Sequence, residues 1–210
     1  MKPDYIIFTD ASVKLVQELN YSAYAAVILN CESLQYTTIS GPLANRSIVF
    51  CEGWAIYQGL RYLKKIQRDT GKKHLKVLIV TDSKLTVNTF TVWIKQSWDT
   101  SDWFDWKKSD HTSVQNQDLY RKVVDLLDSK KLKVRFVHIN SHCKGNKEKE
   151  QAIFAKLDED GVKLSKGAGD VFIAMNDLAD HTAHDIVKDN YRNPKPSIKL
   201  KRRKKASGEK

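Results

Sequence analysis

The stretch LKVLIVTDS, residues 75–83, carries the clearest structural signal in this chain of 210 residues. Its first six residues form an almost continuous apolar run, which is typical of a strand covered on both faces of a sheet. The run ends at Thr81 and Asp82, and Asp or Ser at this position is a good cap for a helix. The stretch therefore predicts a central strand that is followed at once by a helix.

A second apolar run ends with the same two residue types. Residues 5–10 read YIIFTD, so Asp10 follows its strand as Asp82 follows the later one. Ligands of α/β sheets gather at the carboxyl ends of the strands. We therefore expect chemistry at Asp10 and Asp82, although either aspartate alone is equally typical of a turn or a helix cap.

The other segments predict a mixed sheet with helices on its faces. Residues 21–29 and 34–39 are strand candidates that would form a meander with the first strand, and residues 133–139 alternate as a fifth strand should. Strands and helices alternate after this meander, which indicates an α/β fold, a five-stranded mixed sheet with helices on both faces. Helices are expected over about residues 51–67, 84–96, 115–128 and 174–187.

Positive charge is concentrated at the C-terminal end. The net charge is +11, yet residues 191–210 alone hold nine Lys or Arg and one Glu. We expect a folded domain over residues 1–190 and a disordered basic tail over residues 191–210. Such a tail favours a polyanion partner such as nucleic acid, and a nuclear import signal or a solubility role are the alternatives. Residues 143–173 are rich in Lys, Glu, Asp and Gly and are expected to form an inserted, mobile loop.

The sequence points neither to a membrane nor to secretion. It has no apolar run near the roughly 18–20 residues that span a bilayer, and its first residues lack a long apolar signal segment. Its three cysteines, Cys31, Cys51 and Cys143, form no Cys-x-x-Cys pair, so a reducing compartment is expected. These features predict an intracellular, cytoplasmic protein, or a nuclear one if the tail is an import signal. A monomer is expected.

Two further acids complete a carboxylate set. Glu52 shares a helical stripe with apolar residues such as Ile56 and Leu63, since they lie within about 40° of it at about 100° per residue. Glu52 therefore points towards the sheet, which is costly unless a cation or a donor meets it. An ordinary acid at a helix start is the alternative. Asp180 lies on the last helix. Converging carboxylates stay ionised around hard cations, and two cations about 3.5–4 Å apart form a clamp for phosphodiester hydrolysis.

Five short motifs follow one another in a set order. They are FTDAS at 8–12, Glu52 at its helix start, TDS at 81–83, VHINSH at 137–142 and NDLADHTA at 176–183. In this order, and on these element types, they resemble the type 1 ribonuclease H family over about residues 5–186. The resemblance implies a ribonuclease H-like fold and a catalytic domain over residues 1–190. It also implies an endonuclease that hydrolyses the RNA strand of RNA–DNA hybrids to 5′-phosphate and 3′-hydroxyl ends.

The resemblance further implies a role for each acid. Asp10 would bridge two Mg²⁺ ions, with Mn²⁺ as the alternative metal. Glu52 and Asp82 would complete one metal site, and Asp180 would hold the other. His142 would lie on a mobile loop and assist proton transfer or product release. As a bare residue, His142 is equally well explained as an ordinary surface histidine.

The match is weaker in the residues that read the substrate. The family has a glycine-rich turn after its first aspartate, where this chain has Ala11 and the bulky residues 13–20. The family also has Asn or Gln just before its glutamate. Here those places hold Ile48, Val49 and Phe50, which cannot donate side-chain hydrogen bonds to a 2′-hydroxyl. A DNA-directed nuclease or resolvase on the same fold, and a non-catalytic nucleic-acid binding module, therefore stay as alternatives.

A segment rich in tryptophan and lysine lies between residues 93 and 108. In some relatives this place forms a basic protrusion that grips the DNA strand, and aromatic rings interleaved with lysines suit nucleic acid. We expect Lys95, Lys107 and Lys108 to contact the substrate and Trp93 to belong to the core. The alternative is that the tryptophans pack into a small core of the protrusion itself.

Overall fold

The computed structural model describes residues 1–102, 104–128, 131–140 and 144–192, and its central feature is a five-stranded sheet. The strand order is β3-β2-β1-β4-β5. The first three strands form an antiparallel meander, and β4 and β5 continue the sheet in parallel with β1. The predicted mixed sheet is confirmed. The strands are β1 (Tyr5–Val16), β2 (Leu19–Asn30), β3 (Tyr36–Ala44), β4 (Leu75–Thr81) and β5 (Leu132–His138).

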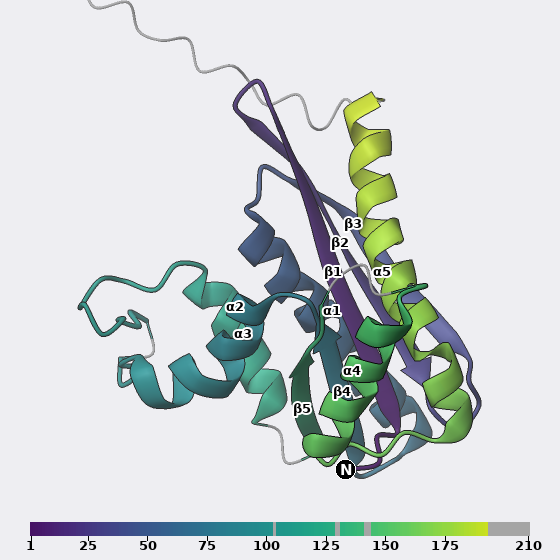
Figure 1. Cartoon of the computed structure of the whole chain (residues 1–210). Coiled ribbons are helices and arrows are strands. Elements are labelled where there is room, and N and C mark those ends of the chain that lie inside the picture. Colours follow the sequence, from purple (N-terminus) through teal and green to yellow (C-terminus); the bar gives the residue numbers. More distant parts are fainter. Residues whose placement is uncertain (103, 129–130, 141–143, 193–210) are drawn as a thin grey trace, which may run out of the picture.

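Helices cover both faces of this sheet (Figure 1). One face carries α1 and α3, and the other carries α4 and α5. A short α2 leads directly into a π-helix, η1, in the connection between β4 and α3. Within the described residues, none of the helices combines the length and the apolar character needed to span a membrane. The helices are α1 (Ile48–Thr70), α2 (Lys84–Asn88), η1 (Thr89–Ser97), α3 (Gln117–Leu127), α4 (Lys147–Glu159) and α5 (Lys166–Arg192).

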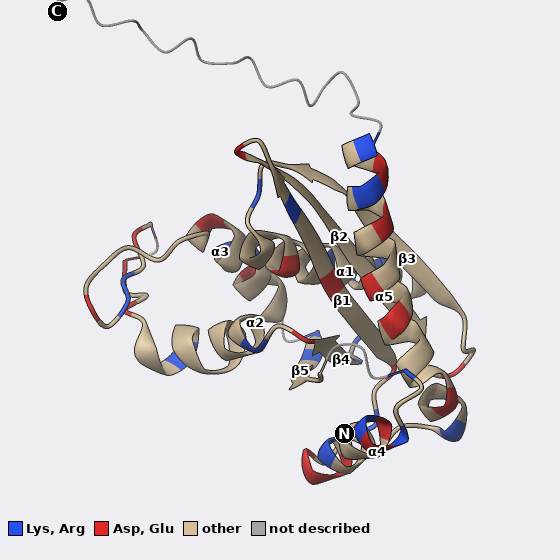
Figure 2. Cartoon of the chain, turned by 45° about the horizontal axis from the view of Figure 1, so that its top comes forward, with Lys and Arg blue, Asp and Glu red and all other residues tan. Residues whose placement is uncertain are grey.

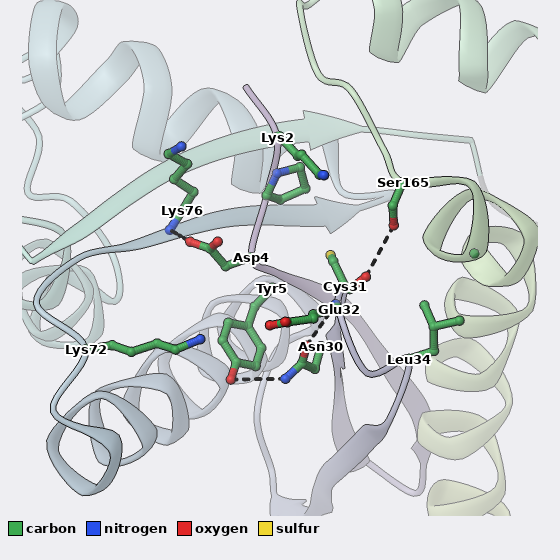
Figure 3. A pocket seen from close by; sticks show the side chains of 12 residues that line it. Lys2, Asp4, Tyr5, Asn30, Cys31, Glu32, Leu34, Lys72, Lys76 and Ser165 are labelled. Carbon is green, nitrogen blue, oxygen red and sulfur yellow. Dashed lines mark hydrogen bonds between the residues drawn. The ribbon is translucent and has the colours of Figure 1, made fainter.

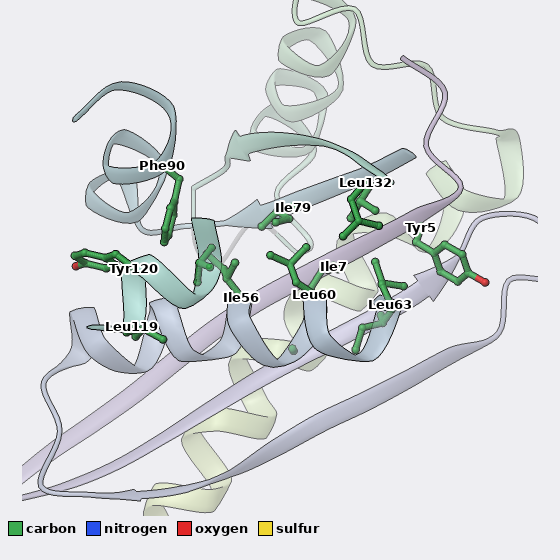
Figure 4. Packing of buried hydrophobic residues seen from close by; sticks show 14 of the residues in the cluster. Tyr5, Ile7, Ile56, Leu60, Leu63, Ile79, Phe90, Leu119, Tyr120 and Leu132 are labelled. Carbon is green, nitrogen blue, oxygen red and sulfur yellow. The ribbon is translucent and has the colours of Figure 1, made fainter. Parts of the chain in front are cut away.

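Each face of the sheet has its own hydrophobic core, because successive residues of β1 point to opposite sides. Ile7 packs with Leu60 and Leu63 of α1 (Figure 4). Phe8 packs on the other side against Phe172 of α5, with ring centroids 4.9 Å apart. Complete burial of such a side chain stabilises the fold by about 1.5–3 kcal/mol. Strand β1 is therefore held from both faces, and it carries Asp10.

Helix α1 lies close to the sheet because Gly59 faces it. A Cβ atom at this position would lie 2.7 Å from Cγ2 of Ile7 and 3.7 Å from Cβ of Ala26. Contacts under about 3 Å between carbon atoms are repulsive, so a larger residue would push the helix away. The glycine thus sets the distance between α1 and β1, and with it the depth at which α1 places its side chains.

The expectation of a loop over residues 143–173 is wrong for the described part of that segment. Residues 147–159 form α4, and α5 begins at Lys166 rather than at about residue 174. Ile153, Leu157 and Phe172 are buried against the α5 face of the sheet. Only Ile153 and Leu157 of α4 are fully buried, so its Lys- and Glu-rich sequence conceals the helical period.

Strands β1 and β2 are longer than the sequence predicted, and they form a hairpin that runs past the other strands (Figure 1). The turn consists of Gln17 and Glu18, whose φ angles are 47° and 67°. Two successive positive φ angles match the twist of a two-residue hairpin turn. Neither residue is the Gly or Asn that is typical of such a turn, so the sequence pattern did not predict the turn.

Helix α5 accompanies this hairpin to the same end of the molecule (Figure 1). The ring of Tyr191 meets the ring of Tyr21 with centroids 5.8 Å apart, and Nζ of Lys14 lies 4.1 Å from the centre of the Tyr191 ring. Residues 191 and 192, the first two of the expected tail, are therefore helical. The rest of that tail, residues 193–210, lies outside the described residues.

Candidate active site

Three carboxylates meet where β1 and β4 pair. The parallel register sets Thr9 opposite Thr81, so the next residues along the chain, Asp10 in β1 and Asp82 just after β4, lie close together. One oxygen from each of Asp10, Glu52 and Asp82 lies within 4.8 Å of the others. The convergence of Asp10 and Asp82 expected from their shared position after an apolar strand is therefore present.

Helix α1 brings Glu52 to this cluster. The helix begins at Ile48, where Ser47 caps it by accepting a hydrogen bond from the amide of Phe50 at 3.3 Å. Glu52 then faces the sheet and is only 4% exposed, which confirms the orientation predicted from its helical stripe. The hydroxyl of Thr81 donates to its Oε2 at 3.2 Å, which supplies one of the donors that a buried carboxylate needs.

Burial and mutual repulsion raise the pKa values of these acids. Burial raises the pKa of Asp10 to about 8, with further contributions from the Asp82 and Asp180 carboxylates, while the amide of Ala11 at 2.6 Å opposes the shift. The pKa of Glu52 is also raised, first by burial and then by Asp10 and Asp82. Such a cluster holds its negative charge at neutral pH only if cations compensate it.

The fourth acid, Asp180, reaches the cluster from α5. Its side chain hydrogen-bonds the side chain of Asp10. Figure 2 shows acidic positions of β1 and α5 side by side. Asp177, one turn earlier on α5, lies instead 2.8 Å from the ammonium of Lys144. The two neighbouring aspartates of this helix are thus distinguished by their partners, and Asp180 is the one that joins the carboxylates.

Two residues to which the sequence assigned no role support the cluster. Thr81 holds Glu52, as described above. Nε2 of His138 lies 3.0 Å from the backbone carbonyl of Asp82, and it donates this hydrogen bond because a carbonyl oxygen can only accept. Burial lowers the pKa of this imidazole. The pairing of Thr81 with His138 in the β4–β5 register produces this contact. Only the alignment of the two strands could have revealed it.

The donor set fits a hard divalent cation. Carboxylate oxygens on three elements converge, and this is the ligand type that Mg²⁺ and Mn²⁺ prefer. The pKa of Asp10 and of Glu52 is raised, which means that ionising both carboxylates is unfavourable without a positive charge between them. Asp10 occupies the shared position, since it contacts both the Glu52–Asp82 side and Asp180. The predicted His142 lies outside the described residues.

The lysines predicted to contact nucleic acid lie apart from the carboxylates. Lys95 is exposed on η1, beside a groove of about 560 Å³ between η1, α3 and β5. Nζ of Lys107 lies 2.6 Å from the carboxylate of Asp105 and donates to Ser113 at 3.0 Å. Lys108 is partly buried in the same connection. Substrate contact by these three lysines stays a prediction.

The described tryptophans of this connection, Trp93, Trp98 and Trp106, pack mainly on the protein itself. The rings of Trp93 and Trp98 lie 5.8 Å apart, and Trp98 in turn contacts Tyr120 of α3 at 5.9 Å. Trp106 is almost completely buried. These contacts favour the interpretation in which the tryptophans build a core of the protrusion. Trp93 is only partly buried and meets Trp98, so its assignment to the core stays a prediction.

Comparison with known proteins agrees with this architecture. The RNase H family profile matches residues 2–156. The chain belongs to the RNase H family. Proteins named ribonuclease H from Thermoanaerobacter sp. (strain X514) and Thermoanaerobacter pseudethanolicus are each 30% identical to it over 89 residues, which is 42% of this chain. The chain spans about half the length of these curated relatives, 49%.

Solved structures share the fold at lower identity. A foamy viral protease–reverse transcriptase, described in complex with an RNA/DNA hybrid, matches 88% of this chain with 20% of its own, at a TM-score of 0.59 and 16% identity. A type 1 RNase H that carries the type 2 active-site motif matches 85% of each chain, at a TM-score of 0.52 and 12% identity. The predicted ribonuclease H-like fold is therefore confirmed.

Proposed function

We propose that this chain is an endoribonuclease that hydrolyses the RNA strand of RNA–DNA hybrids with the help of two Mg²⁺ ions. The observation that carries the proposal is the convergence of Asp10, Glu52 and Asp82 within 4.8 Å, with Asp180 hydrogen-bonded to Asp10. An aspartate that only forms a turn or caps a helix is not expected to lie beside three other carboxylates. Four acids from four separate parts of the chain in one place are costly for the fold, and metal-assisted phosphoryl chemistry is a function that accounts for this cost.

Each acid has a distinct task in this proposal. Asp10 would contribute to holding both cations, Glu52 and Asp82 would help to hold one of them, and Asp180 would help to hold the other. Bound cations would supply stabilisation of the charge on the phosphate and a lower pKa for the attacking water, the chemistry that would leave 5′-phosphate and 3′-hydroxyl ends. Mn²⁺ suits the same oxygen ligands. A proton-transfer or product-release role for His142 belongs to the same proposal.

The protein around the acids keeps them in position. The Thr81 hydroxyl orients Glu52 at 3.2 Å, and the His138 ring anchors the backbone that carries Asp82 at 3.0 Å. Both contacts act on ligands rather than on substrate, so Thr81 and His138 are positioning residues. Such contacts reduce the reorganisation that a metal site needs when it is filled.

The hybrid is proposed as substrate on family grounds, because a relative is described with an RNA/DNA hybrid. One observation favours the second candidate, a DNA-directed nuclease. Ile48 is 43% exposed at the first turn of α1, and Val49 and Phe50 follow it. These apolar side chains offer no hydrogen bond to a 2′-hydroxyl, so discrimination between RNA and DNA must come from backbone groups or from shape.

A cleavage assay distinguishes the two candidates. End-labelled RNA–DNA hybrid, duplex DNA and duplex RNA of one sequence are incubated with the full chain and Mg²⁺, and excess chelator serves as control. We expect cleavage of the RNA strand of the hybrid alone, and none with chelator. Cleavage of duplex DNA would favour the second candidate. Activity that persists in chelator would refute the metal-dependent mechanism, and the Asp10→Asn variant controls for a contaminating nuclease.

A further inference from the structure

The outward side of helix α1 carries a row of basic residues in its C-terminal half. Arg61, Lys64, Lys65 and Arg68 are spaced by three and four residues, so they share one face of the helix. They are exposed or partly exposed. Further lysines continue the row at the end of the helix. We call the whole set the basic face: Arg61, Lys64, Lys65, Arg68, Lys72, Lys73 and Lys131.

This concentration of charge is local. Residues 61–76 hold seven Lys or Arg and one Asp, whereas residues 1–190 as a whole are nearly balanced, with 27 basic and 24 acidic residues. Of the ion pairs between described residues, one involves the basic face, between Nε of Arg68 and Asp69 at 3.6 Å. Most of its positive charge therefore faces solvent without a carboxylate partner in the described part of the chain.

The arrangement is unfavourable for the folded protein by itself. Like charges four residues apart on a helix destabilise it, and Arg61–Lys65 and Lys64–Arg68 are two such pairs. The pKa of Lys64 is lowered, first by partial burial and then by the ammonium of Lys131. The helix dipole favours a cation in the last turn, which accounts for Arg68 and not for Arg61 or Lys64. Stability of the helix therefore does not explain the charge.

Two grooves run along the basic face and share Lys64 and Arg68. One, of about 600 Å³, is lined by the basic residues of α1 together with Tyr57 and Tyr62. The other, of about 670 Å³, lies at the end of the helix and includes Lys131. The row of cations thus borders a continuous depression rather than a flat surface.

The same depression leads on to the amino-terminal edge of the sheet. Lys72 also borders a third pocket, of about 570 Å³, where it extends beside Tyr5 and where Lys2 and Lys76 lie (Figure 3). Positive charge accordingly continues beyond α1. Two acids also line this pocket, Asp4 and Glu32, and Asp4 accepts a hydrogen bond from the backbone amide of Lys76 at 2.7 Å.

A ladder of stacked groups connects the basic face to the active-site end of α1. The guanidinium of Arg46 lies 4.5 Å from the ring of Phe50, and Phe50 stacks on Trp54 with centroids 5.9 Å apart. Trp54 then meets Tyr57 at 5.3 Å, and the Arg61 guanidinium lies 5.5 Å from that ring. Stacking restricts the motion of the rings and of the two guanidinium groups. The positive charges of Arg46 and Arg61 are therefore held in place at the two ends of the ladder.

We propose that the basic face binds the phosphate backbone of nucleic acid that extends from the active site. Glu52 and Arg68 belong to one helix and lie about 24 Å apart along its axis at about 1.5 Å per residue, a span of roughly seven phosphates at about 3.4 Å each. The partner is a polyanion with regularly spaced charges, which the helical spacing of the cations matches. The proposal takes the kind of partner from the proposed function, but it does not depend on cleavage.

The test compares two variants of the full chain. Lys64→Gln/Lys65→Gln/Arg68→Gln removes three charges from the basic face. Lys147→Gln/Lys149→Gln/Lys163→Gln removes three exposed charges from the opposite side of the sheet, where α4 carries mixed charges (Figure 2). Affinity is measured in chelator, at several salt concentrations, for a hybrid and a duplex DNA of about 30 base pairs each. Circular dichroism melting verifies that both variants are folded.

We expect the basic-face variant to bind both duplexes about tenfold more weakly at about 0.1 M salt, with a slope of log affinity against log salt reduced by roughly two to three. The α4-side variant should bind like the parent. If the first variant does not fold, Lys72→Gln/Lys73→Gln/Lys131→Gln removes the same charge from outside the helix and should give the same loss.

Equal affinities and slopes for the basic-face variant and its control would overturn the proposal and would leave an acidic protein as the partner to seek. An equal loss in both variants would also overturn it, since that result reflects overall charge. Failure of the proposed function gives a different result. A chain that cleaves neither duplex, or cleaves DNA, would still show the difference between the two variants.

Discussion

The hydroxyl of Thr81 donates a 3.2 Å hydrogen bond to the carboxylate of Glu52 and thereby joins strand β4 to helix α1 at the acid cluster. Both residues are buried, so water cannot replace the donor. We expect Thr81→Val to reduce turnover about tenfold and to raise the Mg²⁺ concentration needed for half-maximal rate, since loss of such an outer contact usually costs about 10–100-fold.

The matched control for this prediction is Thr9→Val. Thr9 is equally buried on the neighbouring strand, and its hydroxyl donates to the backbone carbonyl of Val80 at 3.3 Å rather than to an acid. Steady-state cleavage across a Mg²⁺ titration provides the measurement. If the cleavage rates of the two variants depend on Mg²⁺ concentration in the same way, the Thr81 hydroxyl stabilises the sheet and does not position Glu52.

Asp10 should make the metal-free protein less stable as the pH rises. Its folded-state pKa is about 8 instead of 3.8, so between these values the native state binds more protons than the unfolded state. Stability then falls as the pH rises from about 4 to about 8, by on the order of 1–3 kcal/mol once neighbouring acids share the effect. Thermal melts in chelator from pH 5 to pH 9 measure it.

Asp10→Asn should remove most of this pH dependence and abolish turnover. The amide cannot ionise, so the variant should melt higher than the parent at about pH 8 in chelator, where the parent carries the repulsive charge. Added Mg²⁺ should stabilise the parent and have little effect on the variant. A variant that melts lower than the parent at every pH would indicate a structural role for Asp10 instead.

Gly59 should tolerate no side chain. The added methyl group of Gly59→Ala would lie 2.7 Å from Ile7, and we expect a loss of about 1–3 kcal/mol in the free energy of unfolding. Gly169→Ala is the control, because no atom lies within 4 Å of the new methyl group and the position is helical. This second change should stabilise the protein by about 0.5–1 kcal/mol. Urea denaturation measures both, and similar effects of the two changes would contradict the packing argument.

Lys95 and Lys107 should differ as substrate contacts. Lys95 is exposed, whereas Nζ of Lys107 is already 2.6 Å from the carboxylate of Asp105. We expect Lys95→Gln to raise KM for the hybrid about threefold with kcat unchanged, as the loss of one phosphate contact should. Lys107→Gln should change KM less, since its charge is partly compensated. The reverse order would show that the ion pair opens on binding.

The sheet and its acids could be predicted because they depend on local pattern. An apolar run followed by Thr-Asp occurs twice, and the parallel register of β1 with β4 brings Asp10 and Asp82 together. Glu52 was recognisable from its helical stripe alone. For Asp180 the sequence predicted only a position on one face of the last helix. Its contact with Asp10 depends on the packing of α5 on β1.

Features set by tertiary packing could not be predicted. Helix α4 buries only Ile153 and Leu157, which is too few apolar positions to show a period in a Lys- and Glu-rich segment. The hairpin turn uses Gln17 and Glu18, whose types do not announce positive φ angles. The contact of His138 with Asp82 depends on which strands are neighbours, and that is a property of the whole sheet.

The length of β1 has a consequence for the way in which the site responds to a cation. Asp10 lies inside a strand that continues to Val16, and Glu52 and Asp180 lie inside long helices, so folding alone fixes the backbone of three of the four acids. Asp82 is the exception, because it follows the end of β4 and precedes α2. In the proposed metal complex, conformational entropy would therefore be lost mainly at residue 82, and the His138 hydrogen bond would limit that loss. Residue 82 is thus the one member of the four-acid site that lies outside a helix or strand, and its backbone is held by the His138 ring.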